Sequence, residues 1–403
     1  MTNEMKNVPG LRFPEFDGYW EEKKLKDISN KGMYGIGASA TEFDGENVYV
    51  RITDINESSR KINNDKLTSP DKLDKKYLLN ENDVLFARTG ASTGKTYIHK
   101  HYDRDKNYYF AGFLIKFEFK NNYLANFIFQ NTLTKRFENW VSVMSVRSGQ
   151  PGINSEEYGK LKMMFPSKVE QNKIGAFFSK LDRQIELEEQ KLEKLEEQKK
   201  GYMQKIFSQE LRFKDKNGND YPEWKKEIIG NIATTFSGGT PSSTNSTFYT
   251  GEIPFIRSGE ISKNSTELMI NEKAISNSSA KMVETGDLLY ALYGATSGEV
   301  AISKINGAIN QAVLCIRSQE SIGYIFNYLK MKKDQILKTY IQGGQGNLSA
   351  SIIKKVDIDL PSLEEQKLIG HFFNKFDDYI EIQSDKVKLL KERKKGFLQK
   401  MFV

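Results

Sequence analysis

The sequence predicts an α+β protein made of two globular modules, each followed by a long helix, in a pseudo-two-fold internal repeat. Three observations support this prediction: a helical segment that occurs twice, shorter matches upstream of both copies, and an apolar seam of heptad spacing in each copy. We expect the 403 residues to divide into four parts, which are module one (1–165), a central helical repeat (166–208), module two (209–360) and a C-terminal helical repeat (361–403).

The repeat is clearest in the two helical segments. Three blocks return 195 residues later, namely 166–171, 174–178 and 199–207 as 361–366, 369–373 and 394–402. Upstream, Leu11-Arg12-Phe13 matches Leu211-Arg212-Phe213, and the loop 90–94 matches 294–298. The two halves differ almost completely between these matches. Each half is therefore expected to be a variable module followed by a shared helix.

Both helical segments carry a start signal and a long seam. Ser167 with Glu170 and Ser362 with Glu365 form the capping-box pattern that is typical of a helix start. Apolar residues then step by three and four over four heptads, which indicates a coiled coil.

Polar residues in the seams indicate how the two helices pair. A parallel in-register pairing would place Lys199 against Lys394. We therefore expect an antiparallel intramolecular coiled coil with Glu188 opposite Lys394 and Lys199 opposite Gln383. About 39 residues at ~1.5 Å each would make a rod of roughly 58 Å with a module at each end. The alternative is that each helix packs on its own globular core.

Each module mixes short β-type runs with helical stretches. Strands are expected at 83–87, 113–117, 287–290 and 312–316, and helices near 122–139 and 321–340. Cys315 lies in one of these apolar runs and is expected to be a buried strand residue. His99 and His101 lie in a charged loop, where we expect them to be solvated rather than metal ligands.

Composition limits the classes of function. The net charge of +7 and the pI near 9.0 favour an anionic partner. A single cysteine and the lack of an apolar run of ~18 residues fit a soluble protein of the cytoplasm. We find no catalytic constellation and no His/Cys metal-ligand set. The loop 90–96 has three residues between its glycines where a Walker loop needs four, and Glu299 stands at the position of Lys95, so nucleotide hydrolysis is not expected.

Two loops of each module have the chemistry to contact DNA. Small residues let a backbone approach closely, hydroxyls and cations bind phosphates, and Arg, Gln and Asn suit base edges in the major groove. The alternative is that these loops are tight turns with solvated polar residues. The candidate DNA-binding residues are Arg51, Arg88, Thr89, Ser92, Thr93, Lys95, Arg147, Gln150, Arg257, Ser258, Tyr293, Thr296, Ser297, Gln342, Gln345 and Asn347.

The chain resembles the specificity (S) subunit of Type I restriction-modification systems over nearly its whole length. The resemblance rests on the two variable modules, the repeated Ile-Gly-x-Phe-Phe at 174–178 and 369–373, and the endings 199–207 and 394–402. Module two also has the family's Gly-Gly-Thr-Pro at 238–241 and the run 253–261. Module one departs there, because 33–38 reads Met-Tyr-Gly-Ile-Gly-Ala.

The resemblance implies a non-catalytic subunit that binds double-stranded DNA. Each module would read half of a bipartite site, and the coiled coil would set the spacer. Two modification (methyltransferase) subunits would dock on the helices and two restriction subunits would join, and these partners would supply S-adenosylmethionine, ATP and Mg²⁺. The partner-binding residues expected on the helices are Phe177, Phe178, Tyr202, Phe372, Phe373 and Phe397. Two other functions stay open, a coiled-coil adaptor that binds no DNA and an enzyme with an unrecognised site.

Overall fold

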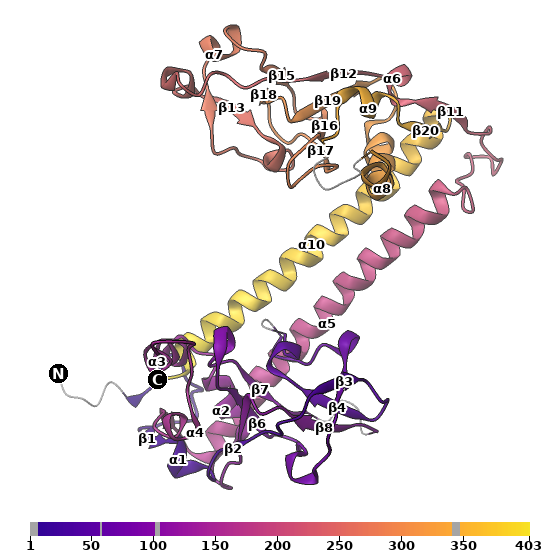
Figure 1. Cartoon of the computed structure of the whole chain (residues 1–403). Coiled ribbons are helices and arrows are strands. Elements are labelled where there is room, and N and C mark those ends of the chain that lie inside the picture. The colour runs from indigo at the N-terminus through magenta and orange to yellow at the C-terminus, as the bar shows by residue number, and fades with distance from the viewer. Residues whose placement is uncertain (1–6, 57–58, 101–104, 341–346) are drawn as a thin grey trace. The chain divides into compact units, whose positions relative to one another are not determined.

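The computed structural model describes residues 7–56, 59–100, 105–340 and 347–403, and the chain forms two compact units. Unit 1 consists of Met1–Lys191 and Ser384–Val403, and unit 2 of Leu192–Gln383. The two long helices are α5 (Lys168–Phe207) and α10 (Leu363–Met401). Each unit therefore contains one module and a part of both long helices (Figure 1).

Unit 1 is built on a four-stranded antiparallel sheet in the order β2-β9-β6-β7. Its strands are β2 (Met33–Tyr34), β6 (Val84–Ala87), β7 (Thr96–Ile98) and β9 (Leu114–Phe117). Three pairs accompany it: β1 (Glu21–Lys24) with β10 (Lys162–Phe165), β3 (Ala40–Glu42) with β5 (Thr68–Pro70), and the parallel pair β4 (Asn47–Val50) with β8 (Asn107–Phe110). The helices of the module are α1 (Leu25–Ile28), α2 (Ala125–Asn131), α3 (Lys135–Met144) and α4 (Ser155–Tyr158).

Unit 2 repeats this plan. Its main antiparallel sheet has the order β12-β19-β16-β17, with β12 (Ala233–Ser237), β16 (Leu288–Ala291), β17 (Val300–Ile302) and β19 (Val313–Ser318). A second sheet has the order β14-β13-β18-β15, with β13 (Ile253–Ile256), β14 (Met269–Ile270), β15 (Lys281–Val283) and β18 (Gly307–Ile309), and β11 (Lys225–Ile228) pairs with β20 (Asp357–Leu360). The helices are α6 (Ile229–Ile232), α7 (Glu272–Ser276), α8 (Ile322–Tyr340) and α9 (Ala350–Lys354).

The central strands confirm the β-type runs predicted from the sequence. In β6, Val84 and Phe86 face one apolar cluster, and Leu85 and Ala87 face another, as the two-residue period of a strand requires. Because both faces of the sheet are covered, all four side chains are buried, and the run is continuously apolar rather than alternating. In β19, Cys315 is fully buried as predicted, and burial raises the pKa of its thiol to about 12.

The prediction for His99 is wrong. The side chain is buried, and its Nδ1 lies 3.0 Å from the Tyr97 hydroxyl. Its ring centroid lies 4.7 Å from that of Tyr108, a residue of β8, the next strand along the chain. Tertiary packing therefore covers a side chain whose sequence neighbours are charged. His101 lies outside the described residues.

Both long helices begin where the capping signals predict, but the glutamates have a different partner. Ser167 Oγ accepts a bond from the Glu170 amide at 3.3 Å, and Ser362 Oγ accepts one from Glu365 at 3.4 Å. The Glu170 carboxylate is buried and receives both Nε and Nη2 of Arg12, at 2.8 and 2.7 Å. The Glu365 carboxylate is equally buried and receives Nε and Nη2 of Arg212, at 3.2 and 2.8 Å. The repeated Leu-Arg-Phe motif thus anchors the start of each module to the start of a long helix.

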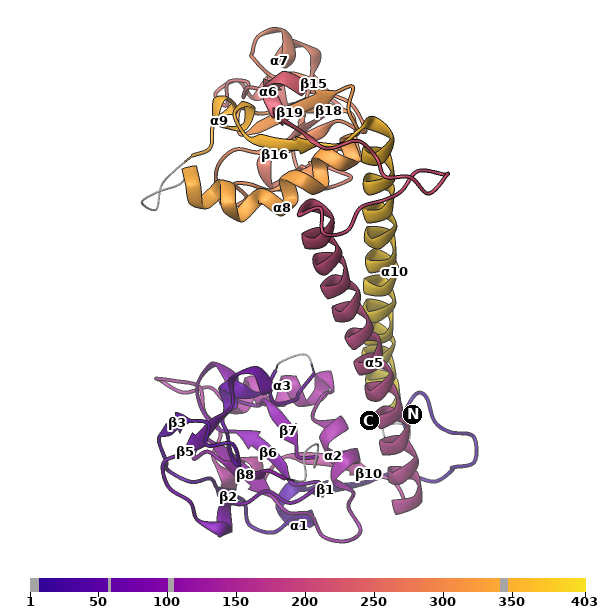
Figure 2. The ribbon, with the colours of Figure 1, turned by 90° about the vertical axis from the view of Figure 1, so that its right-hand side faces the viewer.

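The two helices pair antiparallel within each unit, and Figures 1 and 2 show them side by side. In unit 1 the beginning of α5 packs on the end of α10, with the Phe177 and Phe397 rings 5.1 Å apart. In unit 2 the end of α5 packs on the beginning of α10, with Tyr202 5.4 Å from Phe372. The antiparallel coiled coil predicted from the seams is therefore confirmed.

The predicted register of this pair is wrong. Lys394 Nζ lies 2.6 Å from the carboxylate of Asp182, not opposite Glu188, and Lys199 Nζ lies 2.5 Å from Asp377, not opposite Gln383. Both partners lie six positions from the predicted ones. Glu188 binds Lys386 at 3.1 Å and Lys191 at 3.2 Å. The lysines reach carboxylates that flank the seam, which the seam pattern alone does not reveal.

Candidate nucleic-acid interface

The two candidate loops of module one lie against each other. The loop 88–95 joins β6 to β7 and includes a 3-10 turn at Gly90–Ser92. The Gly90 amide donates to the carbonyl of Pro151 at 2.9 Å, and the Ile153 amide donates to that of Arg88 at 2.9 Å. Segments sixty residues apart therefore form one surface feature. The loop connects two strands of a hairpin, which is not the strand-to-helix setting of a Walker loop.

The cations of this loop pair are half-buried or exposed. The Arg88 guanidinium lies over the Tyr34 ring, 4.9 Å from its centroid, which fixes its direction. Arg147 is exposed and binds Glu157 at 2.5 Å. Lys95 Nζ donates to the Ile55 carbonyl at 3.4 Å, so the loop reaches the segment that follows Arg51.

The uncharged candidate DNA-binding residues of module one fall into two groups: some support the loop backbone, and others are accessible at the surface. Thr93 Oγ1 donates to the Gly90 carbonyl at 2.8 Å and so holds the turn closed. Thr89 joins the loops through a bridge to Gly152. Ser92 is half-buried and Gln150 is exposed. Gln150 therefore has the accessibility that base reading requires, whereas Thr93 mainly shapes the backbone.

Module two brings the corresponding segments together in the same way. The Leu348 amide donates to the Leu292 carbonyl at 2.9 Å, which places Asn347 beside the loop 292–299. Ser297 Oγ donates to the Leu292 carbonyl at 3.0 Å, and Gly294 and Gly298 have positive φ, as do Gly90 and Gly94. Thr296 is half-buried and Asn347 is exposed. Tyr293 packs against the apolar core, and burial raises the pKa of its hydroxyl. Gln342 and Gln345 lie outside the described residues.

The two strand-end arginines are held by carboxylates that the sequence analysis did not single out. Arg51 follows β4 and forms a two-bond fork with Asp54, and Arg257 follows β13 and forms one with Glu260. Hydrogen bonding to Asp54 raises the pKa of Arg51, and hydrogen bonding to Glu260 raises that of Arg257. Ser258, the next residue in module two, is half-buried. The signal that could have found both clamps is an arginine with an acid three residues later, at matched places in the repeat.

The aromatic residues expected to bind partners take different places. Phe178 and Phe373 are fully buried in the cores of their units, so their side chains pack inside the protein and offer no exposed surface. Phe177, Phe372 and Phe397 are half-buried among other rings, and Tyr202 is 39% exposed. More exposed apolar residues lie elsewhere on the helices and were missed by the seam analysis, because they fall outside the heptad core. They are Val169, Leu187, Leu363, Tyr379, Ile382 and Leu389.

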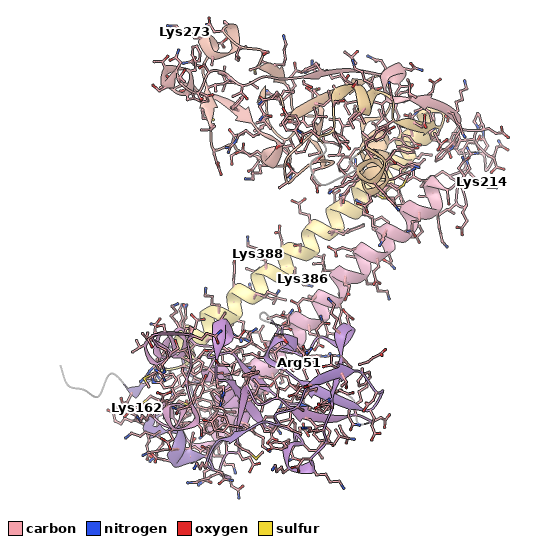
Figure 3. The ribbon with its side chains drawn as sticks, viewed as in Figure 1. Arg51, Lys162, Lys214, Lys273, Lys386 and Lys388 are labelled. Carbon is pink, nitrogen blue, oxygen red and sulfur yellow. The ribbon has the colours of Figure 1, made fainter. Side chains whose placement is uncertain are left out.

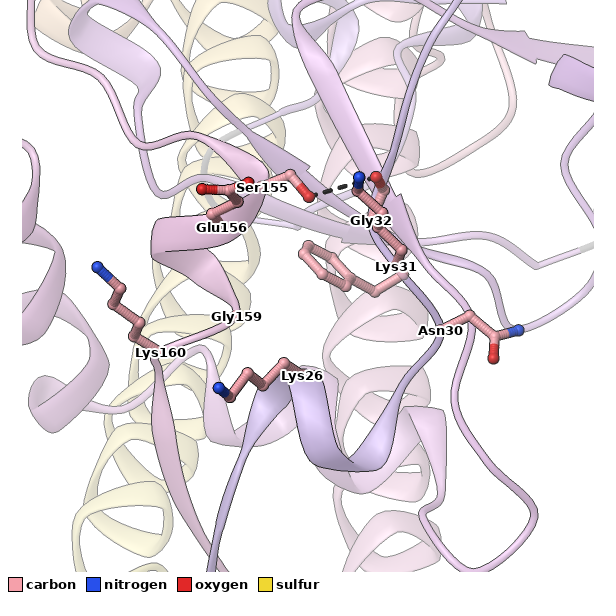
Figure 4. A pocket seen from close by; sticks show the side chains of 9 residues that line it. Lys26, Asn30, Lys31, Gly32, Ser155, Glu156, Gly159 and Lys160 are labelled. Atoms are coloured by element: carbon pink, nitrogen blue, oxygen red, sulfur yellow. Dashed lines mark hydrogen bonds between the residues drawn. The ribbon is translucent and has the colours of Figure 1, made fainter.

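A cavity of about 440 Å³ lies in module one between α1, α4, the segment 30–32 and the end of β9 (Figure 4). Three lysines, Lys26, Lys31 and Lys160, line it together with the Phe117 ring. In module two, Gly230 stands at the position of Lys26. Within the described ranges, no cluster of three or more His, Cys, Asp or Glu side chains could hold a metal ion, and no helix is long and apolar enough to cross a membrane.

Comparison with known proteins agrees with this architecture. The family model of the Type I restriction modification DNA specificity domain matches the chain twice, at residues 18–197 and 221–392. The putative type I restriction enzyme MjaX specificity subunit of Methanocaldococcus jannaschii is 26% identical, with 94% of this chain and 92% of that protein covered. The MjaVIII specificity subunit of the same organism is 22% identical over 98% and 93%.

Solved structures share the fold. The S subunit of a Type-I restriction-modification system from M. genitalium matches with a TM-score of 0.66 at 13% identity and covers 98% of this chain and 99% of its own. A chain from a study of complex assembly in the type I R-M system matches with a TM-score of 0.56 at 16% identity, over 95% and 97%. The two-module fold with paired long helices is therefore one that experiment has already seen.

Proposed function

Because the chain belongs to the Type I restriction modification DNA specificity family, we propose that module one reads one half of a bipartite DNA site and module two the other half. The observation that supports this proposal is that the family's domain occurs twice, once for each module with its following helix. The family's part in the system is recognition of DNA, and its relatives are specificity subunits rather than catalytic ones. The modules differ in their exposed side chains, so the two half-sites should differ in sequence.

The residues proposed to contact DNA are the described candidates of the two loop pairs and the two strand-end arginines. Arg88, Arg147 and Lys95 supply cations in module one, and Gln150 and Asn347 supply exposed amides. Cations bind phosphates and guanine, and amides suit adenine. Gln342 and Gln345 keep the role that the sequence suggests for them, at the corresponding loop of module two.

The long helices are proposed to set the spacer and to hold the partners. Helices of 40 and 39 residues are roughly 60 Å long, which exceeds one turn of DNA at about 34 Å. Tyr379 and Ile382 are 59% and 65% exposed on α10, and such apolar residues suit a docking partner. We infer that two modification subunits bind the helices and two restriction subunits join them. S-adenosylmethionine, ATP and Mg²⁺ then belong to those subunits.

The spacer role is open to a direct length test. Inserting one heptad between 181 and 199, matched by one in α10, should lengthen the helix pair by about 10 Å, or roughly three base pairs. We expect the spacer of the methylated motif to grow while both half-sites stay the same. An unchanged spacer in a variant that still methylates DNA would contradict the role.

The experiment that tests the main proposal is methylation mapping by single-molecule sequencing. The map is made in cells with the cognate modification subunit, with and without this chain. We expect an adenine-methylated bipartite motif that depends on the chain. If the modification subunit is active with another specificity subunit but gives no motif with this one, the adaptor function is favoured. The adaptor function also predicts no DNA binding by the complex, whereas we expect binding that falls steeply with salt.

A further inference from the structure

A clamped arginine occurs at the same place in both modules. Arg51 directly follows β4, which pairs parallel with β8, and Arg257 directly follows β13, which pairs parallel with β18. Each arginine precedes a 3-10 turn, and an acid at the third residue of that turn accepts both the backbone amide and the guanidinium of the arginine. These two acids are Asp54 and Glu260. The arrangement is therefore a property of the repeat and not an accident of one loop.

The clamp of module one leaves half of the guanidinium free. Arg51 donates from Nε to Asp54 Oδ2 at 2.9 Å and from Nη2 to Oδ1 at 2.8 Å. A guanidinium has five N–H groups. Among the described residues, both hydrogens of Nη1 and the outer hydrogen of Nη2 are therefore left without an acceptor. The Arg51 side chain is 33% exposed, while that of Asp54 is only 12% exposed. Within the described part of the chain, Arg51 has no second carboxylate partner.

The clamp of module two is closed on its outer side. Glu260 holds Arg257 Nε and Nη2 at 2.9 and 3.2 Å, and its side chain is 4% exposed. Glu267 binds the same Nη2 at 2.5 Å and is 72% exposed. Its backbone amide donates to Glu260 at 2.9 Å, which ties the two acids together. The outer edge of Arg257 is therefore already occupied by an exposed surface carboxylate.

The segment that follows Arg51 is fixed on two sides. Lys95, from the loop 88–95, donates to the carbonyl of Ile55. Lys61 binds Glu186 of α5 at 2.5 Å, which anchors the far end of the segment to the helix. A side chain held by a fork on a braced backbone loses little freedom when it binds a ligand, which is the requirement for a specific contact.

We propose that Arg51 reads a guanine in the half-site of module one through Nη1 and the outer hydrogen of Nη2, and that Asp54 is its positioning residue. Guanine presents O6 and N7 as two adjacent acceptors in the major groove, and an arginine fork matches them. In module two, Arg257 binds a guanine in this way only after Glu267 turns aside. The inference rests on the proposed function and adds the identity of a base and the residue that reads it.

The test uses the full chain assembled with its modification subunits and a DNA duplex that carries the mapped motif. Each guanine of the half-site of module one is replaced in turn by 7-deazaguanine, which lacks the N7 acceptor, and the Kd is measured by fluorescence anisotropy. The variants are Arg51→Ala, Arg51→Lys, Asp54→Asn and, as a control, Lys162→Ala. Lys162 is an exposed cation paired with Glu22 in the same module, and Figure 3 shows it far from Arg51.

We expect the wild-type complex to lose roughly 5-fold or more in affinity at one guanine. Arg51→Ala and Arg51→Lys should bind the normal site more weakly and lose this sensitivity, and Asp54→Asn should reduce it. Lys162→Ala should keep the wild-type response. Arg51→Lys preserves the charge, so it reports on the fork even if Arg51→Ala does not fold.

Two results would overturn the inference: a half-site of module one without guanine, or equal 7-deazaguanine sensitivity in wild type and both Arg51 variants. Either result leaves the bipartite motif itself intact. Failure of the proposed function is a different outcome, because then no chain-dependent motif exists.

Discussion

Modules one and two share the buried ion pair that anchors each module to a long helix. They differ in the exposed groups around their strand-end arginines. Arg12 with Glu170 and Arg212 with Glu365 form the same buried fork at the start of each helix. Arg51 and Arg257 lie on equivalent turns, yet among the described residues an exposed glutamate covers only the second. The repeat therefore keeps the contacts that fix the backbone and changes the contacts that a partner can reach.

Module one shares only part of the glycine motif of module two. A Cβ at Gly238 would lie 1.8 Å from the Ile309 carbonyl oxygen, so only glycine fits there. Module one lacks the Gly-Gly-Thr-Pro form but keeps Gly35, where a Cβ would lie 2.3 Å from the carbonyl oxygens of Phe110 and Ala111. Module one therefore keeps the glycine that the sheet packing needs but not the Gly239-Thr240-Pro241 that follows it in module two, of which only Thr240 is exposed.

The largest expected effect comes from breaking one anchor at a time. Arg12→Ala leaves the Glu170 carboxylate buried without its guanidinium, which should cost roughly 3 kcal/mol in unfolding free energy. Arg212→Ala should do the same to unit 2 through Glu365. Hydrogen exchange should show the loss of protection in the mutated unit only. Lys135→Ala, which breaks an exposed pair with Glu138, should cost under about 1 kcal/mol. Equal effects of all three variants would contradict the anchor role.

A smaller effect should separate the modules by pH. Burial raises the pKa of Asp83 despite Lys116 at 3.2 Å, whereas the pKa of Asp287 is lowered, because its bonds from Arg317 and the backbone outweigh burial. A lowered pKa gives stability that is lost as the pH falls through the folded value, below about 4. A raised pKa gives stability that is lost as the pH rises through the folded value.

The measurement is the unfolding free energy of each unit between pH 6 and pH 3, from denaturant-dependent hydrogen exchange. As the pH falls, the unfolding free energy of unit 2 in Asp287→Asn should rise relative to that of wild type. The unfolding free energy of unit 1 in Asp83→Asn should fall relative to that of wild type. Shifts of the same sign in both units would rule out this contrast.

The smallest effect should come from Glu267. Glu267→Ala removes an exposed acid, so stability should change by less than about 1 kcal/mol. The outer edge of Arg257 then becomes as open as that of Arg51, and binding should strengthen at the half-site of module two only. The Kd of the assembled complex on the mapped site measures the change, and Glu272→Ala, another exposed acid of module two, serves as the control. Stronger binding by both variants would indicate a general charge effect.

The sequence predicts the features that depend on local periodicity. The apolar runs around Leu85 and Cys315 became central strands, and the serine signals placed both helix starts, because these patterns act over a few residues. The register of the helices was not predictable, since it depends on acids beside the seam such as Asp182 and Asp377. The burial of His99 depends on packing against Tyr108 of β8, which the charged residues around His99 do not indicate.

The sequence predicted which loops form the candidate site but not how these loops contact one another. The repeat identified both loops of each module, yet only the fold shows that Gly90 bonds to Pro151 and that Lys95 reaches Ile55. Residue type and position in the repeat suggested the same DNA-binding role for Arg51 and Arg257. Their difference arises from Glu267, ten residues along the chain, and depends on the path of the loop between them.

The central claim is that each module reads its own half-site, and methylation maps of Arg51→Ala and Arg257→Ala test it most directly. Both variants are expressed with the cognate modification subunit and mapped by single-molecule sequencing beside wild type. We expect Arg51→Ala to relax one position in one half of the motif and Arg257→Ala to relax one position in the other half. Relaxation of both halves by either variant, or of the same half by both, would contradict the claim.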